Sequence, residues 1–439
     1  MKKIVLALSA IALSVTASVS ASEGTLEDKL TLPVSYDSVF QKSMQDPNVL
    51  FYYGATSFER GDYDKSLKWM LEASRYDHPD AIENVKHMIK YNQGTAANRE
   101  GVVDFLSFFA RARGDDAPDI FAQIYLADYY RGDSCVWYAP EERATCVINS
   151  SNVAHEPMSA TDLEKSYFYF EGAAEQGDQR SKFTAGMMNI LGLGVPRNVP
   201  LGLDFLRPIA ESGQSNVAYI IGKTYQDGYW MVQDRKQASA WFEKAISYTQ
   251  HPDSMLEMAK NYESGVIGAN QAERNVQAVA LYEKALSSVS ATIEVKAEAA
   301  FRLGLVYTNF TQYRDEVKAI DYMSKAVSLS SGKPNEFGVK ALIWLGDKEA
   351  SQDLSEAVSL YHKAETMLET LPLNVKQRQA TVWQKIANAH ATGQKGNLEK
   401  SQRDYAFFMN KYHRVMSKTY VPSKDADSYV GFSAFSFPG

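Results

Sequence analysis

The sequence predicts an all-α fold, an α-solenoid superhelix of about nine stacked helical hairpins. The first observation behind this prediction is a repeated pattern of small and bulky residues. The second is the step of roughly 40 residues between most copies of that pattern, which is typical of helical repeats. The third is the composition, because 45% of the 439 residues are hydrophobic and the frequent Ala, Leu, Lys and Glu are good helix formers. A hairpin of this size cannot bury its apolar face alone, so the copies are expected to stack.

Each copy of the pattern has a polar first residue, a small residue four positions later, bulky apolar residues at seven and eight, and a small residue at eleven. These positions lie on one face of a helix with 3.6 residues per turn. The small residues let a neighbouring helix approach closely, and the bulky residues fill the space between. The clearest copies begin at Asp62, Asp162, Asp234 and Asp315 and end at Ala73, Ala173, Ala245 and Ala326.

Looser copies of the pattern extend it over most of the chain. They end at Ala110, Ala210, Ala285, Ala364 and Phe408. An earlier helix is predicted in each copy, where Gly or Ala is followed three residues later by an aromatic residue, as in Gly222 and Tyr225. A turn then leads into the helix that carries the pattern. Each copy is therefore a predicted hairpin of two helices.

The first residue of the pattern is Asp or Asn in most copies. Such residues are favoured at a helix N-cap, where the side-chain oxygen accepts a hydrogen bond from a backbone N–H that has no partner in the helix. Capping therefore explains these residues better than catalysis does. We predict N-caps at Asp62, Asp162, Asn198, Asp234, Asp315, Asp353 and Asn397.

The beginning of the chain has the pattern of a secretory signal. Lys2 and Lys3 precede an apolar run, and Val19-Ser20-Ala21 places small residues at a cleavage site. We predict cleavage after Ala21 and export to the periplasm, with secretion as the alternative. No cysteine near this site could accept a lipid, and no later stretch approaches the roughly 20 apolar residues of a transmembrane helix.

The charge balance is mildly acidic. Without Lys2 and Lys3 the chain has 44 basic and 53 acidic residues, a net charge of −9. A nucleic-acid-binding protein needs a basic stripe, so this balance argues against nucleic acid as a partner. It argues equally against docking on anionic lipid.

One step between pattern copies, from Ala110 to Ala173, exceeds a normal repeat by roughly 26 residues. The extra residues correspond to an insertion at 134–160, which contains both cysteines, Cys135 and Cys146. We expect a disulfide between them, because an oxidising compartment favours one and only one pairing exists. The alternative is two free thiols in a loop. Closure of so short a loop stabilises it by about 2–3 kcal/mol, enough to fix the loop but not the fold.

Insertions in a solenoid lie in loops on one face, which is often the binding face. The insertion carries Trp137 and Tyr138, and another predicted turn carries Tyr229 and Trp230. Tyrosine and tryptophan are common anchors of protein interfaces, and they also stack on sugar rings. We therefore predict partner binding by these four residues. Tyr129 and Tyr130 are expected at a turn as well. The alternative for the insertion is that it covers the groove or packs on a neighbouring hairpin.

The predicted organisation has six parts. Helical repeats flank the insertion, and the segment after Tyr420 loses helical periodicity but keeps Phe432, Phe435 and Phe437. This last segment is expected to cap the final repeat, or else to extend into a partner. The parts are a signal peptide (1–21), a leader or N-terminal cap (22–49), degenerate repeats (50–133), the insertion (134–160), repeats (161–412) and a C-terminal cap or tail (413–439).

The chain resembles Sel1-like repeat proteins, whose repeat is related to the tetratricopeptide repeat. The resemblance rests on Leu191-Gly-Leu-Gly-Val195 and on the run from Phe170 to Gly177. It rests also on Arg235-Lys-Gln-Ala238 with Trp241-Phe242 and Lys244-Ala245. It covers roughly residues 50–412 and is most specific at about 160–250. The turn glycines have a mechanical reason, because two helices must reverse within a few residues and glycine tolerates positive φ.

What this resemblance implies is a non-catalytic adaptor that binds proteins. Exported bacterial proteins of similar layout act as scaffolds in envelope assemblies, such as polysaccharide export complexes and the flagellar motor, or as secreted host-interaction factors. We therefore expect envelope proteins as partners, bound by the concave face and the insertion. Direct binding of a polysaccharide is the alternative, and it would pair exposed aromatics with Asp, Asn or Arg, as around Arg131-Gly132-Asp133.

The sequence contains little that predicts chemistry. Ser330-Ser331-Gly332-Lys333 has the Ser-x-x-Lys spacing of penicillin-recognising enzymes, but the partner motifs are missing and the stretch is expected in a loop. The histidines form no His-Glu-x-x-His motif, so structural roles are expected for them and no metal or cofactor is predicted. They are His78, His87, His155, His251, His362, His390 and His413.

Overall fold

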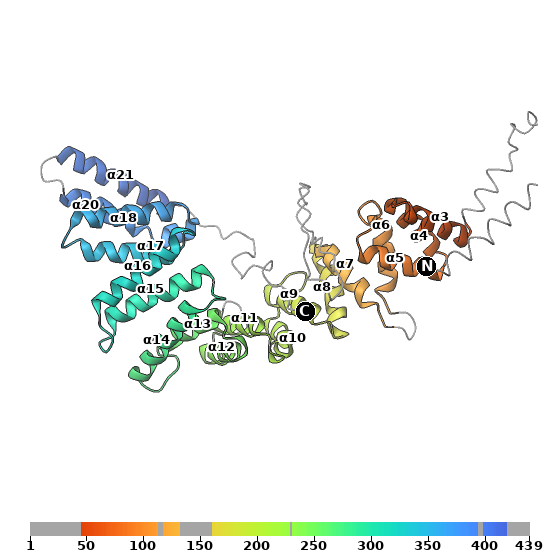
Figure 1. The fold of residues 1–439 in the computed structure, drawn as a ribbon, viewed down its shortest axis with the longest axis horizontal. Helices are drawn as coiled ribbons and strands as arrows, with labels where there is room; N and C mark the ends of the chain where they lie inside the picture. Colours follow the sequence, from red (N-terminus) through yellow and green to blue (C-terminus); the bar gives the residue numbers. More distant parts are fainter. Residues whose placement is uncertain (1–44, 113–116, 132–159, 229–230, 394–397, 419–439) are drawn as a thin grey trace, which may run out of the picture. The chain divides into compact units, whose positions relative to one another are not determined.

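The computed structural model describes residues 45–112, 117–131, 160–228, 231–393 and 398–418. The regular structure within these residues is 19 α-helices, labelled α3 to α21 in Figure 1, so the predicted all-α fold is confirmed. The helices divide into two compact units, α3–α7 and α8–α21.

Unit 1 contains five helices. They are α3 (Pro47–Glu59), α4 (Tyr63–Ser74), α5 (Pro79–Lys90), α6 (Arg99–Phe109) and α7 (Ile120–Arg131). The first two form a close hairpin, in which the hydroxyl of Ser66 donates to the carbonyl oxygen of Gly54 at 2.8 Å. The absence of a side chain at Gly54 makes room for Met70, which is buried.

Unit 2 contains fourteen of the described helices, and the first seven are α8 to α14. They are α8 (Ala160–Glu175), α9 (Gln179–Leu191), α10 (Val199–Glu211), α11 (Ser215–Asp227), α12 (Arg235–Thr249), α13 (Pro252–Glu263) and α14 (Gln271–Ser287). Seven more follow. They are α15 (Ile293–Asn309), α16 (Glu316–Ser331), α17 (Glu336–Glu349), α18 (Leu354–Glu369), α19 (Leu373–Arg378), α20 (Thr381–Gly393) and α21 (Leu398–Met416).

Helices of unit 2 pack on their neighbours along the chain. The closest pairs are the hairpins α9–α10, α11–α12, α13–α14, α15–α16, α17–α18 and α20–α21, which follow one another in Figure 1. The first helices of successive hairpins also contact each other. Helix α13 contacts α15, and α15 contacts α17. Contacts between sequence neighbours are the mark of a solenoid, so this part of the prediction is also confirmed.

The repeated sequence pattern is the buried face of each second helix. Phe242 and Met323, at the second bulky position, have no exposed surface, and neither have Ala245 and Ala326 at the end of the pattern. Each bulky residue lies against a residue without a side chain on the first helix of its hairpin. A Cβ added at Gly222 would come within 2.5 Å of the Phe242 ring. The close approach of the two helices therefore depends on glycine in the first helix.

The predicted N-caps are confirmed for most copies. The side chains of Asp62, Asn198, Asp234, Asp315 and Asp353 each accept a hydrogen bond from a backbone N–H in the first turn of the following helix. The prediction is wrong for Asp162, because α8 begins two residues earlier, at Ala160, and Asp162 lies in its first turn. Asn397 lies outside the described residues.

The turn glycines adopt the backbone conformation that the sequence predicts. Gly192 ends α9 with φ of 73°, and Gly194 has φ of 68°. Gly194 has a second reason to lack a side chain, because a Cβ there would lie 2.1 Å from the carbonyl oxygen of Leu163 in α8. The loop after α9 thus packs its backbone directly onto α8.

Helix α19 is shorter than the helices of the hairpins. It has six residues and lies between α18 and α20, where it contacts both α18 and α21. The hydrophobic core of unit 2 runs along the helices in successive clusters, one centred on α9–α12, one on α13–α17 and one on α17–α21. Each cluster joins neighbouring hairpins, as expected for a solenoid.

Candidate functional site

The four residues predicted to bind a partner, Trp137, Tyr138, Tyr229 and Trp230, lie outside the described residues. The cysteines of the predicted disulfide, Cys135 and Cys146, also lie outside them. These assignments remain predictions.

Tyr129 and Tyr130 belong to the last turns of α7 and not to a turn between helices. The expectation for them is therefore wrong, because the apolar periodicity of α7 continues to Arg131. Their rings meet edge to face with centroids 5.1 Å apart, and both side chains are half-buried.

A row of charged side chains crosses three successive first helices of unit 2. We call Lys223 of α11, Glu257 and Lys260 of α13, and Glu298 and Arg302 of α15 the charged ladder. Lys223 lies 3.7 Å from a carboxylate oxygen of Glu257, and Lys260 lies 3.4 Å from Glu298. The ladder therefore joins three hairpins by ion pairs.

Contacts within each helix complete the ladder. Lys260 lies 2.8 Å from Glu257, three residues before it, and Arg302 lies 3.4 Å from Glu298, four residues before it. Residues at these spacings are neighbours on a helix surface. Arg302 also reaches back to Glu263 of α13 at 3.4 Å, and Glu263 accepts a 2.6 Å hydrogen bond from the Tyr282 hydroxyl.

The sequence contained a signal for the ladder that the pattern of apolar residues did not reveal. Lys223 precedes Glu257 by about one repeat length, and Lys260 precedes Glu298 by about the same distance in the sequence. Opposite charges that recur at the repeat period on first helices would have indicated the ion pairs.

Glu257 is the most buried member of the ladder, with 7% of its surface exposed. Burial alone would raise its pKa, but Lys260 and Lys223 outweigh that effect and hold the pKa below its ordinary value. Gln226 also donates a hydrogen bond to its second oxygen. Glu257 therefore remains charged and fixed in place between two helices.

The ladder lies in an acidic surrounding. Asp253 of α13 is half-buried, and burial raises its pKa, with Glu257 and Glu294 adding to the effect. Burial also raises the pKa of the Tyr219 hydroxyl, and the carboxylates of Glu257 and Asp253 raise it further. Several negative charges therefore act on the same part of the surface.

We call the ladder together with its acidic neighbours the first-helix face. The acidic neighbours are Asp227, Asp253, Glu263 and Glu294. The named face holds six carboxylates against three cationic side chains. The cationic groups of Lys223, Lys260 and Arg302 keep 24% to 30% of their surface exposed. This excess of negative charge gives the face a negative electrostatic potential.

Two histidines act as helix caps, as their structural interpretation predicted. His78 Nδ1 accepts a hydrogen bond from the backbone N–H of Ala81 at the start of α5. His251 Nδ1 accepts one from Ser254 at the start of α13, while its Nε2 bonds Asn216 at 2.9 Å. The His251 ring also stacks on Tyr219 of α11. The two histidines therefore hold helix ends in place.

Acidification is expected to destabilise α13 through His251. Burial lowers the His251 pKa from 6.5 to about 4, so the neutral ring is favoured in the fold. The stabilisation is complete above the unfolded pKa and is lost as the pH falls from 6.5 towards 4. At pH 5 the stabilisation that has been lost is about 2 kcal/mol. Hydrogen exchange of the α13 amides at pH 7 and pH 5 measures this loss of stability, once the exchange rates are corrected for their intrinsic pH dependence.

The His251→Asn variant provides the control for this prediction, because asparagine also caps helices and does not titrate in this range. Its α13 should lose less stability between pH 7 and pH 5 than the wild-type helix does. Equal losses in both proteins would contradict the role of His251.

The fold brings His362 of α18 and His390 of α20 together, which the sequence did not predict. Their ring centroids are 5.9 Å apart, and both rings contact Phe408 of α21. His362 lies 3.0 Å from Glu365, and His390 lies 3.8 Å from Asp404. Within the described residues, no group of three or more His, Cys, Asp or Glu side chains is arranged to hold a metal ion.

The Ser-x-x-Lys stretch begins inside a helix rather than in a loop. Ser330 and Ser331 form the end of α16, because the buried face of that helix continues through Ser330. The Ser330 hydroxyl donates to the carbonyl oxygen of Ala326 at 2.8 Å. A buried hydroxyl at a helix C-terminus differs from the serine at a helix start that the enzyme motif requires.

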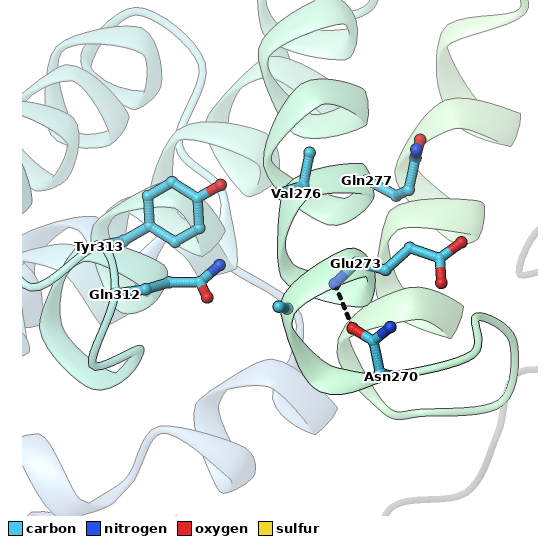
Figure 2. Close-up of a pocket in the computed structure, with 7 residues that line it drawn as sticks. Asn270, Glu273, Val276, Gln277, Gln312 and Tyr313 are labelled. Carbon is cyan, nitrogen blue, oxygen red and sulfur yellow. Dashed lines mark hydrogen bonds between the residues drawn. The ribbon is translucent and has the colours of Figure 1, made fainter.

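A shallow, open hollow lies where the start of α14 meets the loop between α15 and α16 (Figure 2). Asn270 caps α14 there by accepting a 2.9 Å hydrogen bond from the backbone N–H of Glu273. Gln277, Gln312 and the ring of Tyr313 line the same hollow. The hollow therefore combines amide side chains with one aromatic ring.

Comparison with known families explains the architecture. Seven segments of the chain match the Sel1 repeat, at residues 49–75, 157–178, 184–214, 215–247, 252–288, 297–331 and 340–367. This chain is a Sel1 repeat protein. Its repeats form a helical scaffold of a kind that generally binds proteins and does not catalyse reactions. Six of the seven segments lie at or beyond residue 157, where the first-helix face is found.

Solved structures show similar helical arrangements at low sequence identity. A Sel1 repeat protein from Oxalobacter formigenes is 18% identical over 60% of this chain and 94% of its own, with a TM-score of 0.43. A protective antigen of uropathogenic Escherichia coli strains, which displays an SLR fold, is 14% identical over 84% of this chain and 83% of its own, with a TM-score of 0.41. The family assignment rests on the seven repeat matches.

Among the described helices, none is both long and apolar enough to cross a membrane.

Proposed function

We propose that this Sel1 repeat protein is a non-catalytic adaptor that joins proteins of the bacterial cell envelope, in an assembly of the polysaccharide-export or flagellar-motor type. The secretory pattern of residues 1–21 supports the periplasmic location, with secretion and host interaction as the alternative. The repeat family supports protein partners. The observation that carries the proposal is the first-helix face, which spans three hairpins.

The chemistry of this face favours a partner segment rich in Lys and Arg. Six carboxylates lie there, and two of them, Asp227 and Glu294, are more accessible than Glu257. Electrostatic complementarity of this kind mainly raises association rates and selects among partners. The ladder ion pairs contribute by holding the three helices, and so the carboxylates, in a fixed arrangement.

Charge reversal on the face should therefore abolish partner capture. The test variant is Asp227→Lys/Glu294→Lys. The matched control is Glu243→Lys/Asp321→Lys, which makes the same change in net charge at exposed positions on second helices α12 and α16. Purified mature protein is cross-linked to envelope extract of the source bacterium, and captured proteins are quantified by mass spectrometry. We expect at least a tenfold loss for the face variant and less than a twofold change for the control.

Three outcomes separate the alternatives. Equal capture by all variants would place the contact outside the first-helix face. If the Trp137→Ala/Tyr138→Ala variant loses partner capture and the face variant keeps it, the contact is assigned to the predicted insertion. Capture of no defined envelope protein by the wild type would contradict the adaptor function.

The hollow of Figure 2 favours one second candidate, the binding of a glycan. Amide groups such as those of Asn270, Gln277 and Gln312 can both donate to and accept from sugar hydroxyls, and Tyr313 can stack on a sugar ring. A glycan array probed with the wild type and with Gln312→Ala/Tyr313→Ala tests this candidate. Signals that the double variant keeps unchanged would exclude the hollow as the binding site.

A further inference from the structure

The last described helix, α21, has an outer side that points away from the core cluster of α17–α21. Tyr412 of α21 is half-buried against that cluster. Arg403, Phe407, Asn410 and Arg414 lie on the opposite side of the helix, because they follow one another at intervals of three and four residues. All four side chains are exposed. We call these four residues the outer face of α21.

The outer face of α21 is basic in a chain whose net charge is −7. Residues 402–418 contain a single acidic side chain, Asp404, and it lies 3.8 Å from His390 of α20. The same residues contain four cationic side chains, which are Arg403, Lys411, Arg414 and Lys418. The end of unit 2 therefore presents positive charge, in contrast to the acidic first-helix face.

Phe407 is exposed, but its ring has a fixed neighbour. The side chain keeps 56% of its surface exposed, and the Lys411 ammonium lies 5.4 Å from the ring centroid, within the range of a cation–π contact. Lys411 is itself held by Glu365 at 2.6 Å and by Glu369 at 2.9 Å, both on α18. An exposed aromatic ring that is already positioned loses less entropy on binding, which favours its use as an interface anchor.

The first-helix face has the opposite charge and also an apolar contact for such a ring. Glu294 and Glu298 of α15 lie on the same side of that helix as Phe301, because they precede it by seven and three residues. Phe301 is half-buried, and its ring centroid lies 6.1 Å from that of Phe337 of α17. The face therefore places aromatic rings beside its carboxylates.

The two surfaces are also similar in length. Arg403 and Arg414 are eleven residues apart, which is about 16 Å at 1.5 Å per helical residue. The first-helix face spans three helices, and because packed helices lie about 8–10 Å apart, its outer carboxylates are separated by roughly 16–20 Å. The two arginines can therefore reach carboxylates on α11 and α15 at the same time.

Within one chain α21 packs on α20 and α19, which follow α15 by more than one hairpin, so the two surfaces meet between chains. We propose that the outer face of α21 binds the first-helix face of a second copy, so that copies of this protein associate head to tail. The inference rests on the function proposed above, because it assigns a basic ligand to the same carboxylates. An interface between two different surfaces leaves one of each free in a dimer, so further copies can add.

Charge reversal on each surface in turn tests this proposal. The outer-face variant is Arg403→Glu/Arg414→Glu, and the first-helix variant is Asp227→Lys/Glu294→Lys. Purified mature chains are compared by sedimentation velocity at increasing concentration. The average mass of the wild type should rise with concentration, and each variant should self-associate at least tenfold more weakly. An equimolar mixture of the two variants should associate again, because each reversed surface then meets one of opposite charge.

The matched control is Lys325→Glu/Lys363→Glu, which makes the same change in net charge at exposed positions on the second helices α16 and α18. Its self-association should stay within twofold of the wild type. A wild type that remains monomeric up to about 100 µM would overturn the proposal. Self-association that the outer-face variant loses and the first-helix variant keeps would indicate pairing of α21 with α21, and would also overturn it.

Sedimentation with phosphatidylglycerol vesicles distinguishes a membrane surface from a second copy. Vesicle binding by the wild type that the outer-face variant loses, without self-association, would assign the outer face of α21 to anionic lipid and overturn the proposal. The adaptor function is tested separately. Capture of envelope proteins by a chain that stays monomeric would contradict head-to-tail association alone, whereas self-association without capture would contradict the adaptor function alone.

Discussion

The Gly194→Ala variant is expected to destabilise the α8–α10 part of unit 2 by about 2–4 kcal/mol. Two costs add at this position. Gly194 has φ of 68°, a conformation that alanine adopts at a cost of about 1 kcal/mol. In addition, the new Cβ would lie 2.1 Å from the carbonyl oxygen of Leu163, and neither atom belongs to a flexible side chain. The loop after α9 must therefore move away from α8.

A matched control separates the two costs. Gly213 has φ of 102°, but a Cβ there would meet no atom within 4 Å. The Gly213→Ala variant should therefore lose only the conformational contribution, about 1 kcal/mol. Hydrogen exchange of the α8, α9 and α10 amides measures both effects. Equal losses in the two variants would show that the contact between the loop and α8 contributes nothing.

The Trp383→Ala variant should destabilise the α17–α21 region by about 3–5 kcal/mol. Trp383 of α20 is 2% exposed and is among the largest fully buried side chains of the described residues. Its removal would leave a cavity in the terminal core cluster. It would also remove the 3.0 Å hydrogen bond that the indole N–H donates to the Glu365 carboxylate. Glu365 would still have Lys411 and His362 as partners.

How far this destabilisation extends along unit 2 tests the solenoid architecture itself. Stability in a solenoid is the sum of repeat and nearest-neighbour contributions, so exchange should rise in α17–α21 and stay unchanged in α9–α12. The Trp383→Phe variant keeps most of the buried ring and loses the hydrogen bond, so we expect a smaller loss of about 1–2 kcal/mol. Equal acceleration of exchange throughout unit 2 after Trp383→Ala would contradict nearest-neighbour stability.

The first-helix face is polar, and its ion pairs join three hairpins in the middle of unit 2. A charged surface of this kind suits reversible recognition of a basic partner.

The sequence by itself determined the helices and their pairing. Positions four, seven, eight and eleven after Asp234 predicted the buried face of α12, and the structure buries Phe242 and Ala245 there. Asp234 also predicted the N-cap. These features are local, because helical periodicity and capping depend on residues within three or four positions of one another. The misplaced cap at Asp162 shows the limit of such prediction, since a helix can begin a few residues before its strongest signal.

Tertiary structure alone decided which residues meet between hairpins. Lys260 of α13 forms an ion pair with Glu298 of α15, and His362 of α18 approaches His390 of α20. Such contacts depend on the rotation and rise of one hairpin relative to the next, which small differences in loop length change. The contact of Gly194 with Leu163 has the same origin. The periodic apolar pattern specifies that hairpins stack, but the polar surface that they create together follows only from the geometry of the stack.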